Sequence, residues 1–369
     1  MSEYNGASVN IYYVDGENGN DANAGTSTGA AWKTIQHGFD QIASWFSPND
    51  GDELRIMSTS NDATYYAVTG SLDVSWSSKE VSIVGANSSG TVDGTVVEIN
   101  GGNLDSSTPI MLISGSGNDN CSFSNLSFNC GGTAQHGVEA SGSGNNGLSW
   151  INCRFTNATS HGLYTTSLSN YWQFINCRFD NNGGNGLDHY GTQFSMTYKC
   201  LMDNNTGIGY KCGPYSRVAE CIMYNNGGNG LSINGAGSII CNCIIDYNGT
   251  VGVKVWGSST SRFVDNVITN NTGAGLNIDN TDAESVHFNT SFDNNSSAHN
   301  SQNHLILYDF DSAGTVSYED ASGLDFTPTS TSSVIGKGFP THFKTYGSTG
   351  GDAGISKFVQ EGGESISIF

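Results

Sequence analysis

A repeat of 21 to 24 residues runs through the middle of the chain and limits the folds open to it. Residues 150–155 read WINCRF and residues 174–179 read FINCRF. Weaker copies follow, so that the central position of the motif falls at residues 153, 177, 200, 221, 243 and 266. A Gly followed by an apolar residue, as at Gly162, and an Asn pair, as at Asn181, keep the same phase. Self-similarity at such a period indicates a stacked repeat architecture.

The composition of each repeat selects among these architectures. A leucine-rich repeat needs several Leu per unit, whereas these units have about one, and a propeller blade needs about 40 residues. Two or three short strands in each unit predict an all-β, single-stranded parallel β-helix, in which residues of equal phase stack about 4.8 Å apart. Small apolar Cys suits an inward ladder and Asn suits a turn ladder. We therefore expect the Cys and Asn repeats to be structural and the nine cysteines to be mainly reduced.

The pattern divides the chain into three parts. Residues 1–50 contain a strand at 12–15, a Gly/Asn/Asp loop and, at 32–43, apolar residues at i, i+3, i+4 and i+7, which predict an amphipathic helix that caps the solenoid. Residues 51–310 form the β-helix, with irregular coils first and regular ones from about residue 120. Residues 311–369 are a C-terminal cap or assembly segment. The irregular coils are expected to hold short strands at 53–57, 81–84, 96–99 and 110–113.

Charge excludes several classes of partner. The chain has 13 Lys and Arg against 34 Asp and Glu, for a net charge of −21. This balance argues against nucleic acid, and against polyanions unless calcium bridges them. No apolar run approaches 18 residues, so no membrane insertion is expected. The loop with Asp15, Glu17 and Asp21 offers carboxylates for Ca²⁺, although its spacing does not match an EF-hand; no other cofactor or metal is expected.

Both ends of the chain resemble a known superfamily. Tyr12-Tyr13-Val14-Asp15, the Gly/Asp loop and Trp32-Lys33-Thr34-Ile35-Gln36 resemble the opening of pectin-lyase-like right-handed parallel β-helix proteins, and residues 325–336 resemble their close. The resemblance implies right-handed coiling. Its members include polysaccharide lyases, glycoside hydrolases, epimerases and phage tailspikes, so it implies no single activity. The Arg base and calcium-binding Asp cluster of pectate lyases are not matched, because Arg154 and Arg178 have no Asp cluster in phase.

Outward residues on neighbouring coils form the candidate site. If the apolar residue after each ladder Gly points inward, the next residue points outward. The resulting column reads Glu139, Tyr164, Asp188, Lys211, Ser232, Lys254 and Asn277. As catalytic candidates we take Glu139, Asp188, His161 and Lys211. Glu139 and Asp188 are two coils apart, about 9 to 10 Å, near the upper end for inverting glycosidases. As substrate-binding candidates we take His136, Tyr164, His189, Tyr190 and Trp172.

Three functions fit this sequence. The first is a phage or viral surface protein (spike, fibre or decoration protein) that binds a surface glycan, as a homotrimer beside other virion proteins. The first residues show no secretory leader, which favours a virion protein; an extracellular location follows if a leader was removed. The second is a polysaccharide lyase or glycoside hydrolase acting along the β-helix. The third is a non-catalytic carbohydrate-binding adhesion module.

Overall fold

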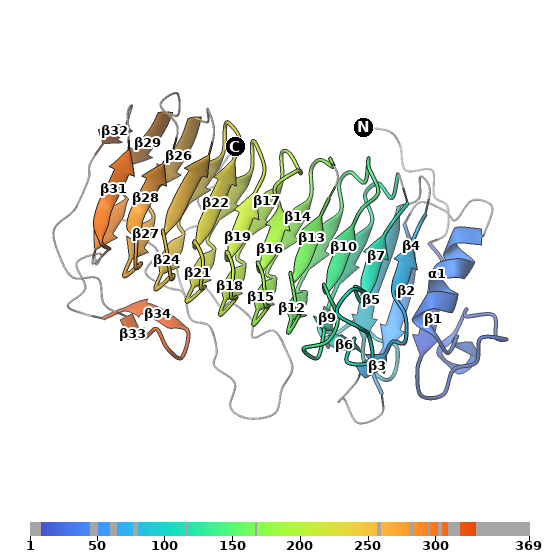
Figure 1. Cartoon of the computed structure of the whole chain (residues 1–369). Helices are drawn as coiled ribbons and strands as arrows, with labels where there is room; N and C mark the ends of the chain where they lie inside the picture. The colour runs from blue at the N-terminus through green and yellow to red at the C-terminus, as the bar shows by residue number, and fades with distance from the viewer. Residues whose placement is uncertain are drawn as a thin grey trace.

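Three parallel sheets wind around one apolar core. The computed structural model describes residues 9–44, 51–59, 65–76, 80–115, 117–166, 168–256, 260–279, 284–288, 290–293, 295–301, 305–308 and 318–329. Within these residues the sheets hold 12, 10 and 10 strands, and we call them sheets A, B and C. From β2 to β31 each coil contributes one strand to each sheet in turn, so the chain forms a parallel β-solenoid (Figure 1). The predicted fold class is confirmed.

The strands of each sheet follow one another along the solenoid axis. Sheet A consists of β1 (Ile11–Asp15), β2 (Asp52–Met57), β5 (Val81–Ala86), β8 (Ser122–Ser124), β11 (Ser149–Ile151), β14 (Gln173–Ile175), β17 (Met196–Tyr198), β20 (Arg217–Ala219), β23 (Ile239–Cys241), β26 (Thr260–Val264), β29 (Glu284–Phe288) and β32 (Leu305–Tyr308). Sheet B consists of β3 (Tyr65–Ala67), β6 (Val97–Asn100), β9 (Leu126–Asn129), β12 (Arg154–Thr156), β15 (Arg178–Asp180), β18 (Leu201–Asp203), β21 (Ile222–Tyr224), β24 (Ile244–Asp246), β27 (Val267–Thr269) and β30 (Ser291–Asp293). Sheet C consists of β4 (Leu72–Val74), β7 (Met111–Ile113), β10 (Val138–Ala140), β13 (Leu163–Thr165), β16 (Leu187–His189), β19 (Tyr210–Cys212), β22 (Leu231–Asn234), β25 (Val253–Trp256), β28 (Ala274–Ile278) and β31 (Ser297–Ser301).

Stacked identical residues fill the interior, as the repeat predicts. Phe155 lies between Phe128 and Phe179, with ring centroids 5.3 and 4.7 Å away. The nine cysteines are free and buried. Five of them form the predicted ladder, in which the Cys177 backbone N–H donates to Cys200 Sγ at 3.4 Å. Burial raises the pKa of the Cys212 thiol to about 12, which keeps it protonated.

An asparagine ladder closes the turn between sheets B and C. Asn182 Nδ2 donates to Asn205 Oδ1 at 2.8 Å, and the same bond links each later coil through Asn295. Each amide also donates to a carbonyl of the preceding coil, as Asn182 does to Phe155 O. The residue before each ladder Asn from Asn182 to Asn271 has a positive φ, for example 56° at Asn181; Asn tolerates this conformation well and fills all of these positions except Tyr247. Both members of each Asn pair therefore have a structural role.

The amphipathic helix lies at the N-terminal end of the solenoid (Figure 1). α1 (Ile35–Ser44) follows a 3₁₀ turn, η1 (Thr28–Ala30), and buries Ile35, Phe39 and Ile42. It begins three residues later than predicted, because Trp32 pairs with Val14 in a β-bridge. The Trp76 indole packs edge-on against Phe39 at 5.1 Å and donates to its carbonyl. This position fits the predicted cap.

The described part of the C-terminal segment lies on the flank of the solenoid. β33 (Tyr318–Asp320) and β34 (Asp325–Pro328) form an antiparallel pair below sheet B (Figure 1). Phe326 is fully buried against an apolar stripe on the outer face of sheet B, made of Leu201, Ile222, Ile244 and Val267. These residues cover a side of the rod rather than its open end; residues 330–369 lie outside the described part.

Candidate functional site

The outward column on sheet C has the register that the sequence predicts. Glu139 pairs with Tyr164, Tyr164 with Asp188, and Asp188 with Lys211. The column continues through Ser232, Lys254 and Asn277. The flanking strand residues are buried, so Glu139, Tyr164 and Lys211 are the partly exposed members of their strands. Four catalytic and binding candidates thus share one outer face.

Two histidines precede this column and replace asparagine in a backbone-binding role. His136 Nδ1 accepts the backbone N–H of His161 at 3.1 Å, and His161 Nδ1 accepts that of Asn185 at 2.8 Å. On the next coil Asn185 Oδ1 accepts the N–H of Ile208 at 2.8 Å. The two imidazoles stack with centroids 5.3 Å apart. An Nδ1 atom that accepts a hydrogen bond places the proton of the neutral ring on Nε2, so each ring is a donor at Nε2.

The electrostatics of these histidines keep them neutral at pH 7. Burial, and to a smaller extent the neighbouring His161, lowers the pKa of His136 to about 4. Burial also lowers the pKa of His161; Asp188 opposes this shift and Lys211 adds to it. A neutral ring whose Nδ1 is already bonded cannot take a proton from a substrate there. This geometry therefore does not suit His161 as a catalytic base. It does suit His161 as a hydrogen-bond donor.

Tyr164 completes a small aromatic surface. Its ring centroid lies 5.1 Å from that of His136 and 5.0 Å from that of His161. Its ring is half-buried, so it offers an apolar surface and a hydroxyl together. His136 is only 3% exposed, so His161 and Tyr164, both half-buried, supply the accessible part of this group; we call His136, His161 and Tyr164 the His–Tyr face.

The charged members of the column bind one another. Asp188 is 3% exposed and accepts from Asn185 Nδ2 at 2.8 Å, and Lys211 Nζ lies 3.5 Å from the same oxygen. Lys211 also lies 4.1 Å from the centroid of the Tyr190 ring, which is exposed. Asp188 Oδ1 is enclosed and has no hydrogen-bond partner in the described residues. Lys211 thus neutralises Asp188 locally.

Glu139 stands apart from this pair. Burial raises the pKa of its carboxyl, the direction that a general acid requires. The register places it two coils from Asp188, roughly 9 to 10 Å by strand spacing. Because Asp188 is nearly buried and bonded to Asn185 and Lys211, it is poorly placed to activate a water.

Two predicted surface residues lie inside the solenoid. His189 is fully buried, and its Nε2 lies 2.8 Å from Ser195 Oγ and 3.2 Å from Tyr210 Oη. Strand alternation turns it inward because Asp188 points outward. Trp172 is fully buried and donates from Nε1 to Asn145 O. Their predicted place on the outer face is wrong.

A polar groove that the sequence does not predict lies beside the His–Tyr face. It has a volume of about 580 Å³ and runs along the turn between sheets B and C. None of its lining residues is charged: Asn129, Gly131, Gly132, Asn157, Ala158, Thr159, Asn181, Asn182, Gly183, Asn204 and Thr206. The repeat assigns the first Asn of each pair to a turn, and two of these residues, Asn181 and Asn204, also line this groove.

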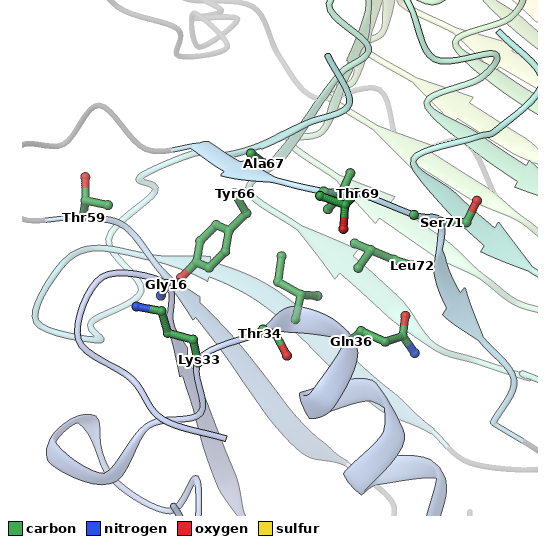
Figure 2. A pocket seen from close by; sticks show the side chains of 13 residues that line it. Gly16, Lys33, Thr34, Gln36, Thr59, Tyr66, Ala67, Thr69, Ser71 and Leu72 are labelled. Carbon is green, nitrogen blue, oxygen red and sulfur yellow. Dashed lines mark hydrogen bonds between the residues drawn. The ribbon is translucent and has the colours of Figure 1, made fainter. Parts of the chain in front are cut away.

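A second cavity, of about 530 Å³, lies between the N-terminal cap and β3–β4 (Figure 2). Tyr66 points into this region, and its hydroxyl accepts the Gly16 N–H at 2.8 Å and lies 2.8 Å from Met57 O. Burial raises the pKa of Tyr66. Lys33 donates to Glu17 O. These bonds join the N-terminal cap to the first coils, so the cavity lies at a structural junction between the two.

The N-terminal carboxylates have structural partners. Asp15 Oδ1 accepts the backbone N–H groups of Glu17 and Asn18. Asp21 accepts those of Lys33 and Thr34, just before α1. No group of three His, Cys, Asp or Glu that suits a metal ion occurs in the part of the chain that the structure describes. Calcium at Asp15, Glu17 and Asp21 stays a prediction. No helix among the described residues is long and apolar enough to cross a membrane.

Comparison with known proteins gives the family. A family profile described as a right-handed β-helix region matches residues 110–296 and 203–323, which together exceed half of the chain. The chain belongs to the right-handed β-helix family. The right-handed coiling that the resemblance implies is confirmed. No curated protein sequence matches it significantly.

Solved structures of this β-helix family resemble the chain in fold. A rhamnogalacturonan lyase has a TM-score of 0.61 at 14% identity, over 85% of this chain and 92% of that one. The pectate lyase Pel9A has a TM-score of 0.58 at 15% identity, over 86% and 85%. ORF18 of Geobacillus virus E2 has a TM-score of 0.54 at 15% identity, over 76% of this chain and 58% of that one. Identities this low establish the fold and no activity.

Proposed function

We propose that this β-helix protein binds a neutral polysaccharide on the His–Tyr face and the adjoining groove, without cleaving it. The observation that carries the proposal is the pair of backbone-anchored, neutral imidazoles beside Tyr164 and a groove lined by amides. Amides and the Nε2–H group of half-buried His161 suit sugar hydroxyls, and the Tyr164 ring suits the apolar face of a sugar ring. Asp188 is neutralised by Lys211, so this face does not select for a charged sugar.

Rigid placement supports recognition. The backbone bonds at Nδ1 fix both imidazole rings before a ligand arrives. Groups held in their bound geometry lose little conformational entropy on binding. The same bonds remove the base that turnover would need, which favours binding over catalysis.

The experiment is a binding and turnover panel on the full chain. Affinities for soluble dextran, xylan, galactomannan and polygalacturonate are measured by calorimetry, alongside assays for new reducing ends and unsaturated uronates. We expect binding to a neutral polymer with no products, and at least tenfold weaker binding for Tyr164→Ala. Absence of binding to every polymer contradicts the proposal, as does unchanged affinity in the variant.

Glu139 favours a second candidate, a glycoside hydrolase. Its raised pKa suits an acid at the edge of the His–Tyr face. A hydrolase predicts new reducing ends that are lost in Glu139→Gln with little change in affinity. Products that persist in Glu139→Gln, or no products at all, exclude Glu139 as the catalytic acid.

The setting we propose is the surface of a virion, where the rod presents this face to a glycan and assembles with its own copies and other virion proteins. The fold likeness to a phage protein is compatible with this setting and carries no more than the fold. Native mass spectrometry tests the predicted trimer; a monomer at micromolar concentration contradicts it.

A further inference from the structure

Three aromatic side chains line the corner between sheets C and A. The backbone N–H of Tyr171 donates to Gln193 O and that of Phe194 donates to Pro214 O, so Tyr171, Phe194 and Tyr215 occupy the same phase on three coils. Their rings stack with centroids 5.4 and 4.9 Å apart. All three are exposed, by 58%, 45% and 45%. We call Tyr171, Phe194 and Tyr215 the aromatic ladder.

The ladder is held in an unfavourable backbone conformation. The φ angles of Tyr171, Phe194 and Tyr215 are 62°, 56° and 56°. The left-handed region is unfavourable for residues other than Gly, and this cost at three positions exceeds the stabilisation from two stacked ring pairs. Fold stability therefore does not explain why bulky aromatics occupy these positions.

Other coils use small or polar residues at this phase. Asn120, Gly147 and Gly237 take it on neighbouring coils, with φ of 57°, 69° and 77°. A Cβ atom on Gly237 would lie 2.4 Å from the Tyr215 ring, so only glycine fits beside that end of the ladder. Gly147 and Gly237 thus flank the three rings on the neighbouring coils, so the ladder ends at a glycine on each side.

Polar groups follow the ladder on the outer face of sheet A. Gln173 and Arg217 are exposed and lie two residues after Tyr171 and Tyr215. Arg217 has no carboxylate partner in the described part of the chain, unlike Arg154 and Arg178, which pair with buried Asp residues. An apolar strip with hydrogen-bond donors along one side matches a polymer that has apolar faces and hydroxyl edges.

We propose that the aromatic ladder is a second contact strip for a linear polysaccharide, which runs parallel to the solenoid axis. The inference rests on the proposed function for its ligand class. Stacking fixes each ring before binding, so contact with sugar C–H groups orders few additional side chains. Gln173 and Arg217 donate to hydroxyl groups beside the rings. The strained backbone is retained because it presents the rings to the ligand.

The test compares Phe194→Asn with Tyr247→Asn. Tyr247 is also exposed, by 52%, and has a φ of 54°, but it lies on the turn between sheets B and C. Both variants replace a strained aromatic with a residue that tolerates this conformation, so both are expected to fold. Binding is measured by calorimetry with the polymer of the panel that wild type binds most tightly. We expect at least tenfold weaker binding for Phe194→Asn and less than a twofold change for Tyr247→Asn.

Equal affinity of Phe194→Asn and wild type overturns the proposal, and so does a wild type that binds none of the polymers. If Tyr164→Ala loses binding while Phe194→Asn keeps it, the result supports polysaccharide binding at the His–Tyr face and refutes binding at the aromatic ladder. If Phe194→Asn loses binding while Tyr164→Ala keeps it, the result supports binding at the aromatic ladder and refutes binding at the His–Tyr face. Light scattering tests whether the ladder instead contacts a second copy of the chain. A lower molar mass for Phe194→Asn than for wild type would show that it does, and would overturn the polysaccharide assignment.

Discussion

Replacing His136 with Asn should remove part of the acid sensitivity of the fold. The His136 pKa is about 4 in the folded chain, against 6.5 for an ordinary histidine. The unfolded chain therefore takes up a proton below pH 6.5, whereas the folded chain does so only near pH 4. The stability that neutral His136 supports is complete above pH 6.5 and is lost as the pH falls towards 4. At pH 5 the loss is about 2 kcal/mol, from 1.5 pKa units at about 1.4 kcal/mol each.

Asparagine is the informative substitution because Asn185 already performs the same task on the second coil after His136. Its Oδ1 accepts the next backbone N–H at 2.8 Å, as His136 Nδ1 does at 3.1 Å. His136→Asn should keep this bond and lose the titration. Urea unfolding at pH 7.5 and pH 5.0, with equal m values, gives the free energies. We expect wild type to lose about 2 kcal/mol more than the variant between the two pH values. An equal loss in both proteins refutes the reasoning, as does a His136 NMR resonance that titrates near pH 6.5.

Three further substitutions or measurements test the packing. Tyr247→Asn should raise the unfolding free energy by about 1 kcal/mol, because Asn tolerates the left-handed conformation that neighbouring coils fill with Asn; a loss of stability contradicts this. Arg178→Met should cost about 3 kcal/mol or more, because it leaves fully buried Asp203 without its bidentate partner. Lys199→Met removes a half-buried, solvent-accessible pair with Glu220 and should cost less than about 1 kcal/mol. Equal losses of unfolding free energy in the two variants would contradict a stabilising role for the Arg178–Asp203 pair. A thiol reagent should modify none of the nine cysteines in the native protein and all nine after unfolding without reductant; fewer than nine indicates disulfides.

The repeat carries enough information to predict the register of the fold. Equal phase places Glu139, Tyr164, Asp188 and Lys211 in one column because each coil repeats its hydrogen bonds with the next. The Asn and Cys ladders follow from the same argument, since a residue that suits one coil suits its neighbours at the same phase.

The features that the sequence does not reveal depend on the direction in which a side chain points and on its contacts with neighbouring coils. His189 was expected outside because it follows Asp188, although strand alternation turns it towards Ser195 and Tyr210. Trp172 lies at the end of a turn, where the phase counted from the ladder Gly no longer applies. The histidine bonds at Nδ1 could not be inferred, because they depend on a backbone N–H of the following coil.

The spacing of the aromatic ladder is visible in the sequence. Tyr171, Phe194 and Tyr215 are 23 and 21 residues apart, the same steps as the repeat. Their exposure and positive φ become evident only in the structure, because aromatic residues at a turn are more often expected in the core.

The central claim is that the His–Tyr face and the adjoining groove bind a polysaccharide intact. A crystal structure of the full chain soaked with an oligosaccharide of the polymer bound best by wild type tests it most directly. We predict an unbroken oligosaccharide in contact with Tyr164, within hydrogen-bond distance of His161 Nε2 and of the Asn side chains of the groove. A sugar bound elsewhere on the rod, or one cleaved beside Glu139, contradicts the account.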